Sequence, residues 1–179
     1  MTTFLFPDNT VLCNFAAVDR LDLLESALNH RGRWTEAVAY EASRSVSSLP
    51  VLASVVSDGW LGEPIRIDAE SDIQEVNRLR RAVFGGMDHE PLKHLGEAET
   101  CHLILNDDRF TGSWWISDDR EALRYARFQG ITTRETIDIV AIAVAQGDIA
   151  ETQAFDLMHK MVQAGRSPHL PRTTAQLRH

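Results

Sequence analysis

The chain has 179 residues, of which 44% are hydrophobic and 25% are charged. This balance is typical of an ordinary globular protein and excludes wholesale disorder, a collagen-like chain and a disulfide scaffold. The 26 acidic residues outnumber the 18 basic ones, giving a formal net charge of −8, which argues against a protein that coats duplex DNA non-specifically but not against an enzyme that contacts nucleic acid through one local patch.

The cysteines and the apolar runs exclude further classes. Cys13 and Cys101 lie among apolar residues and have no metal-like spacing to a histidine, so neither a disulfide framework nor a zinc site is expected. No stretch approaches the roughly 20 apolar residues of a membrane span. The N-terminus has no basic segment before Pro7, so we expect a cytoplasmic protein with no membrane partner.

In chain order, short apolar runs alternate with helical patterns. The first half predicts strands at 2–6, 33–38 and 65–68, and helices at 9–16, 21–28, 35–46, 50–56 and 72–84. The second half predicts helices at 95–105, 120–128, 137–144 and 150–164, with strands at 113–116 and 131–133. Strands that alternate with helices indicate an α/β fold with a parallel sheet. We expect one domain over residues 1–165 and a flexible tail over residues 166–179, which hold few apolar residues.

Acidic residues follow both of the most apolar strands. Asp8 ends the first, and Asp118 and Asp119 end the strand at 113–116. Ligands of open parallel sheets bind at the carboxyl ends of the strands. Glu97 opens the helix LGEAE, and Glu41 lies in the helix WTEAVAYEAS.

Carboxylates that converge repel one another, and a divalent cation removes that cost. Oxygen ligands suit Mg²⁺ or Mn²⁺, and such ions serve phosphodiester hydrolysis. Taken singly, each acid also fits a structural role as a helix cap or as a first-turn residue.

Two groups of arginines lie on predicted helices. Arg120, Arg124 and Arg127 have i, i+4, i+7 spacing beside the Asp pair, which fits either RNA phosphate binding or a solvated face that pairs with acids. The same alternatives apply to Arg78, Arg80 and Arg81, where a solvated face is favoured.

Three segments together resemble PIN-domain proteins. FLFPDNTVLCNFAAVDRLDLL resembles the opening of that family, and HLGEAETCHLILN resembles the GEAE-type helix of one branch. WWISDDREALRYARFQGI resembles the strand, acidic pair, Arg-bearing helix and Gly-Ile of the same branch. The resemblance implies a three-layer α/β/α sandwich and a Mg²⁺- or Mn²⁺-dependent ribonuclease, most often the toxin of a toxin–antitoxin pair. An antitoxin protein and a second copy of the chain are then possible partners.

By this resemblance, Asp8, Glu41 and Glu97 match the first three family acids, and the fourth is Asp118 or Asp119. The implied metal ligands are Asp8, Glu97 and one of the Asp pair. Glu97 stands where Asp is commoner, and residues 48–86 match poorly.

Two other functions compete with the nuclease. A non-catalytic PIN-like interaction module would keep the fold and bind a protein partner. A haloacid-dehalogenase-like phosphatase also opens with a strand and an Asp, but it needs a second Asp where this chain has Thr10, so we set it aside.

Overall fold

The structure, a computed structural model, describes residues 3–178. Three short strands form one parallel sheet in the order β1-β2-β3. The strands are β1 (Leu5–Pro7), β2 (Trp114–Ile116) and β3 (Thr132–Arg134). This sheet and the helices around it confirm the predicted α/β class.

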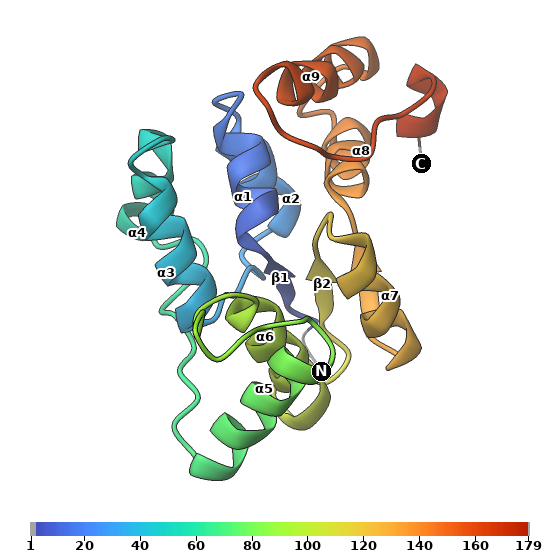
Figure 1. Cartoon of the computed structure of the whole chain (residues 1–179). Coiled ribbons are helices and arrows are strands. Elements are labelled where there is room, and N and C mark those ends of the chain that lie inside the picture. Colours follow the sequence, from blue (N-terminus) through green and yellow to red (C-terminus); the bar gives the residue numbers. More distant parts are fainter. Residues whose placement is uncertain (1–2, 179) are drawn as a thin grey trace.

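Helices connect the strands and surround the sheet (Figure 1). They are α1 (Asn9–Ala16), α2 (Leu21–Leu28), α3 (Glu36–Ser45), α4 (Ala53–Asp58), α5 (Glu70–Ala82), α6 (Leu95–Asn106), α7 (Arg120–Phe128), α8 (Thr136–Gln146) and α9 (Glu151–Gln163), with the short 3₁₀ helices η1 (Pro50–Leu52) and η2 (Thr174–Leu177). Between residues 3 and 178, no helix is both long and apolar enough to cross a membrane.

Both faces of the sheet are buried, because adjacent residues of a strand point to opposite sides. Leu5 and Ile116 belong to a core that also contains apolar residues of α1, α2, α8 and α9. Phe6 and Trp115 belong to a second core, with residues of α6 and α7. Apolar runs buried on both faces are typical of parallel strands, and the result is a layer of helices on each side of the sheet.

Two of the expected strands are present only as single bridges. Thr35 pairs with Ile65, and Gly32 with Leu5. The Oγ1 of Thr35 accepts a hydrogen bond from the N–H of Val38 at 3.3 Å, so this residue caps α3 and leaves no extended chain at 36–38. Of the strand expected at 2–6, residue 2 lies outside the described residues.

The C-terminal segment is packed, contrary to the flexible tail expected over residues 166–179. Leu177 is fully buried, and η2 contacts α8 and α9 (Figure 1). The Nε of Arg178 lies 2.6 Å from a carboxylate oxygen of Glu151. Two apolar residues, Leu170 and Leu177, pack this segment against the main core. Residue 179 lies outside the described part of the chain.

Candidate functional site

Asp8 ends β1 and caps the N-terminus of α1. Its Oδ1 accepts hydrogen bonds from the backbone N–H of Val11 at 2.9 Å and the hydroxyl of Thr10 at 2.5 Å. Burial raises the pKa of this carboxyl to about 6, the charge of Asp118 acts in the same direction, and hydrogen bonds, among them one from Ser117, act against it. A carboxyl that titrates this close to neutrality is unusual for Asp and is typical of functional sites.

Asp118 and Asp119, which follow β2, lie in two different environments. The Oδ1 of Asp118 accepts the backbone N–H of Thr136 at 3.0 Å, and its Oδ2 accepts the Thr136 hydroxyl at 2.5 Å and the Asn14 amide at 2.7 Å. Burial raises the pKa of Asp118. Asp119 instead caps α7, where its Oδ1 accepts two first-turn N–H groups at 3.0 Å. The structure therefore brings Asp118 near Asp8 and turns Asp119 toward the helix.

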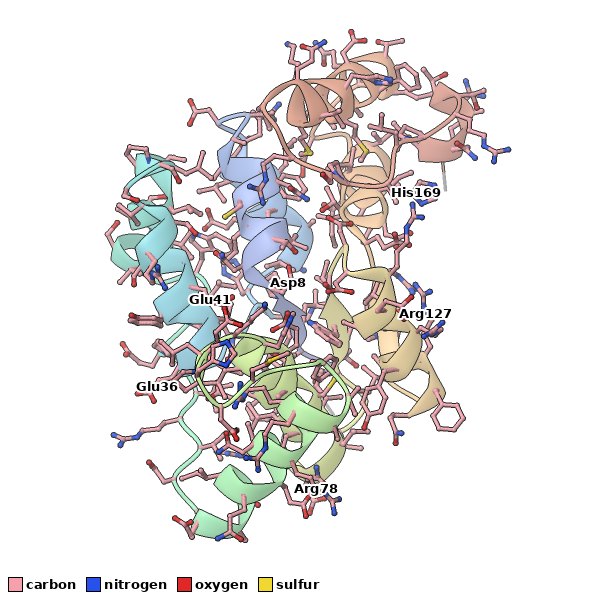
Figure 2. All side chains as sticks on the ribbon, in the orientation of Figure 1. Asp8, Glu36, Glu41, Arg78, Arg127 and His169 are labelled. Carbon is pink, nitrogen blue, oxygen red and sulfur yellow. The ribbon has the colours of Figure 1, made fainter. Side chains whose placement is uncertain are left out.

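Glu41 projects from α3 toward the same region (Figure 2). Within residues 3–178, its carboxyl forms neither a hydrogen bond nor an ion pair with another side chain. Burial raises the pKa of Glu41 to about 8, and the charges of Glu97 and Asp8 raise it as well. Removing a carboxylate from water without a partner costs free energy. The position of the Glu41 side chain therefore lowers the free energy of unfolding.

The glycine of the LGEAE segment makes room for Glu41. A Cβ at Gly96 would lie 3.4 Å from the Glu41 Oε1 and 2.9 Å from the Val38 Cγ2, so a larger residue would push α3 and α6 apart. The next residue, Glu97, lies 3.0 Å from the Nδ1 of His94. Glu99 accepts the N–H of Ala37 at 3.1 Å and so ties α6 to the start of α3.

The candidate acids have the donor chemistry of a hard-cation site, but they are not assembled into one. Among residues 3–178, no three His, Cys, Asp or Glu side chains lie close enough together to hold a metal ion. Asp8 and Glu41 nevertheless have raised pKa values, and in the same part of the chain no Arg or Lys pairs with them. Carboxylate oxygens that repel one another and have no cationic partner fit Mg²⁺ or Mn²⁺.

The arginines of α7 line a separate surface cavity. Arg120, Arg124 and Arg127 share a cavity of about 610 Å³ with His169, and Figure 2 shows Arg127 and His169 on the opposite side of Asp8 from Glu41. Arg124 pairs with Glu121 at 2.5 Å. The three arginines therefore do share one surface, although part of their charge is compensated.

The expectation that the arginines of α5 face solvent is wrong for Arg80. Arg78 and Arg81 are exposed, but Arg80 is only 2% exposed. Its Nη1 donates to the backbone carbonyls of Met87 at 3.2 Å and Glu90 at 3.1 Å. This arginine therefore fastens the loop before α6 rather than facing solvent.

Sequence reasoning missed two polar residues that hold Asp118. Asn14 is buried on the apolar side of α1, and Thr136 is buried two residues after the end of β3. Both carried a signal: Asn14 interrupts an otherwise apolar helix face, and Thr136 follows the third strand at the same sheet edge as Asp8. The strand-end rule that located the acids applies to Thr136 as well.

One comparison with known proteins gives a match. A family model described as a PIN domain matches residues 6–172. The match includes residues 48–86 and the C-terminal helices, which the sequence motifs alone did not explain. No match was found among curated proteins or among solved structures.

Proposed function

The chain belongs to the PIN-domain family, a family of nuclease-type fold, and from this premise we propose that it is a Mg²⁺- or Mn²⁺-dependent ribonuclease. The observation that carries the proposal is a pair of carboxyls with raised pKa values, Asp8 at the end of β1 and Glu41 on α3, of which the first raises the pKa of the second by its charge. Perturbed acids without cationic partners favour a catalytic site over a structural one.

In this proposal, Asp8, Glu97 and Asp118 or Asp119 hold the metal. When bound, the ion neutralises charge on the phosphodiester and activates a water. The hydrogen bonds from Asn14 and Thr136 fix the orientation of Asp118, which is the support that a ligand carboxylate needs. Asp119 stays a candidate beside Asp118, because only its Oδ1 caps α7 and its Oδ2 accepts no hydrogen bond within residues 3–178.

Glu41 is the proposed proton donor to the leaving oxygen, since the folded chain keeps this carboxyl protonated at pH 7. A pKa of about 8 places its titration close to neutral pH, where a general acid or base works best. In hydrolysis, a water oxygen bonds to phosphorus, its proton passes to a base, and the leaving oxygen takes up the Glu41 proton as the ester bond breaks. Glu41 contacts no hydrogen-bond donor within residues 3–178, which leaves both of its oxygens available for this transfer.

The arginines of α7 supply RNA phosphate contacts in this proposal. Arg120 directly follows Asp119, so Arg120, Arg124 and Arg127 form a basic stripe that leads away from the acids. A guanidinium binds phosphate through paired N–H groups. The substrate would then lie across the sheet edge, with its scissile phosphate at the acids and its flanking phosphates along α7.

Two finer roles rest on the resemblance of the GEAE helix and the Asp-Asp segment to one branch of the family. The chain would act as a cytoplasmic toxin, with an antitoxin protein as its partner and possible assembly into a homodimer. The alternative is a non-catalytic interaction module, and the observation that favours it is that no three acids between residues 3 and 178 lie within metal-binding distance of one another.

The test is cleavage of structured RNA by the purified chain with and without Mn²⁺ or Mg²⁺. We expect metal-dependent cleavage that Asp8→Asn abolishes without lowering Tm, because the substitution removes a repulsive buried charge and keeps an acceptor for Val11. Asp156→Asn, an exposed acid on α9, is the matched control and should cleave normally. A wild type that neither cleaves RNA nor is thermally stabilised by the ions would establish the interaction module instead.

A further inference from the structure

Arg166 occupies a fixed position directly after α9. The chain reverses at Gly165, whose φ of 79° lies in the left-handed region. The N–H of Gly165 donates to the carbonyl of Val162 at 2.9 Å, and the N–H of Arg166 donates to that of Met161 at 3.0 Å. This pair of bonds is the Schellman motif that ends many helices. The backbone of Arg166 is therefore held by the end of α9, although the segment was expected to be flexible.

The Arg166 side chain is linked to the candidate acids through Asn14. Its Nε donates to the Asn14 Oδ1 at 3.1 Å, and the Asn14 amide nitrogen donates to the Asp118 Oδ2 at 2.7 Å. Asn14 is buried, so it orients the guanidinium and the carboxylate together. A polar side chain whose two ends are both bonded has little freedom to rotate.

Arg166 also lines a cavity with both members of the Asp pair. The cavity measures about 290 Å³ and is bounded by Thr10, Asp118, Asp119 and Arg166, among others. Within residues 3–178, Arg166 forms no ion pair, although its side chain is partly buried. Only its Nε is hydrogen-bonded in that part of the chain, which leaves the two terminal nitrogens of the guanidinium free.

We propose that Arg166 binds a non-bridging oxygen of the scissile phosphodiester in this cavity. The inference rests on the proposed ribonuclease function. Acids that hold a metal also repel the phosphate, and a single cation beside them offsets that repulsion. The guanidinium fork matches phosphate geometry, and its charge stabilises the negative charge that develops on the phosphoryl oxygens during hydrolysis. Because the fork is already oriented by Asn14, little side-chain freedom is lost on binding.

The test compares Arg166→Ala, Arg166→Gln and Arg166→Lys with Arg172→Ala, which removes an exposed arginine from the same segment. In RNA cleavage with Mn²⁺, we expect kcat to fall about 10²- to 10³-fold in Arg166→Ala, the loss typical when one donor to a developing anion is removed. Arg166→Gln keeps a donor for Asn14 without the charge, and it should lose a similar factor. Arg166→Lys should recover part of the rate, and Arg172→Ala should match wild type.

The salt dependence of RNA binding distinguishes a phosphate contact from a purely structural role of Arg166, because only a phosphate contact changes it. In an Asp8→Asn background that does not cleave, removing Arg166 should lower the slope of log affinity against log salt by about 0.7, the value for one phosphate of a single strand. Asn14→Ala should leave that slope unchanged while it slows cleavage.

Equal kcat in Arg166→Ala and Arg172→Ala, with equal slopes, would overturn the inference and leave the ribonuclease proposal intact. A wild type that neither binds nor cleaves RNA would overturn both.

Discussion

Replacing Glu41 by Gln should stabilise the protein at neutral pH in the absence of metal. The pKa of this carboxyl is about 8 in the folded chain, against 4.5 as its ordinary value. Between these pH values the folded state holds a proton that the unfolded state has lost. The free energy of unfolding therefore falls as the pH rises through this window, and Gln, which does not ionise, removes that loss.

The size of the effect follows from the two pKa values. One pKa unit corresponds to about 1.36 kcal/mol, and pH 7 lies about two and a half units above 4.5. Glu41 therefore lowers the free energy of unfolding by about 3 kcal/mol at pH 7. At pH 5 it lowers the free energy of unfolding by under about 1 kcal/mol. For a chain of this length, about 3 kcal/mol corresponds to a rise in Tm of roughly 6–12 °C in Glu41→Gln at pH 7.

The assay is thermal unfolding of wild type and Glu41→Gln at pH 5 and pH 7 in the presence of EDTA. Glu36→Gln, which removes an exposed acid from the same helix, is the control and should change Tm little at either pH. A Glu41→Gln protein no more stable than wild type, or one whose gain is the same at both pH values, would refute the argument. The same variant should lose RNA cleavage, because stability gained by removing a strained acid is typically offset by lost function.

Two further substitutions test the packing of the site and its basic surface. Gly96→Ala places a methyl group 2.9 Å from the Val38 side chain and should lower the free energy of unfolding by about 1–3 kcal/mol; an unchanged urea midpoint would show that α3 and α6 separate freely. Arg124→Ala should weaken binding of single-stranded RNA and lower its salt slope by about 0.7, measured by fluorescence anisotropy. A slope equal to that of wild type would argue that Arg124 serves only its pair with Glu121.

The elements of this fold were predictable wherever their patterns depend on local sequence alone. The apolar runs that contain Phe6 and Trp115 predicted β1 and β2, because strands buried on both faces need continuous apolar residues. The alternation at 65–68 looked equally like a strand, yet Ile65 forms only one bridge. Pairing requires an extended partner, and Glu36 already begins α3 on the other side. The sequence pattern of one segment cannot reveal whether its partner is free.

The candidate site was predictable to the level of the sheet edge and no further. The strand-end rule placed Asp8 and Asp118 in one region, since parallel strands end at the same edge. It could not separate Asp118 from Asp119. Successive side chains point in different directions, and the contact that distinguishes them is an Asn14 amide 104 positions away in the chain. Such a choice depends on tertiary contacts that no local pattern records.

The position of the cations limits what this acidic chain can bind. With a net charge of −8, the chain as a whole repels RNA, so the proposed RNA binding depends on a few arginines beside the acids. The helix pattern located Arg120 and its neighbours on α7, because their spacing repeats within one element. Arg166 carried no such pattern, since its place follows from the turn at Gly165 and from Asn14 on a distant helix. Arg166, which is linked to Asp118 through Asn14, therefore could not be found from sequence periodicity.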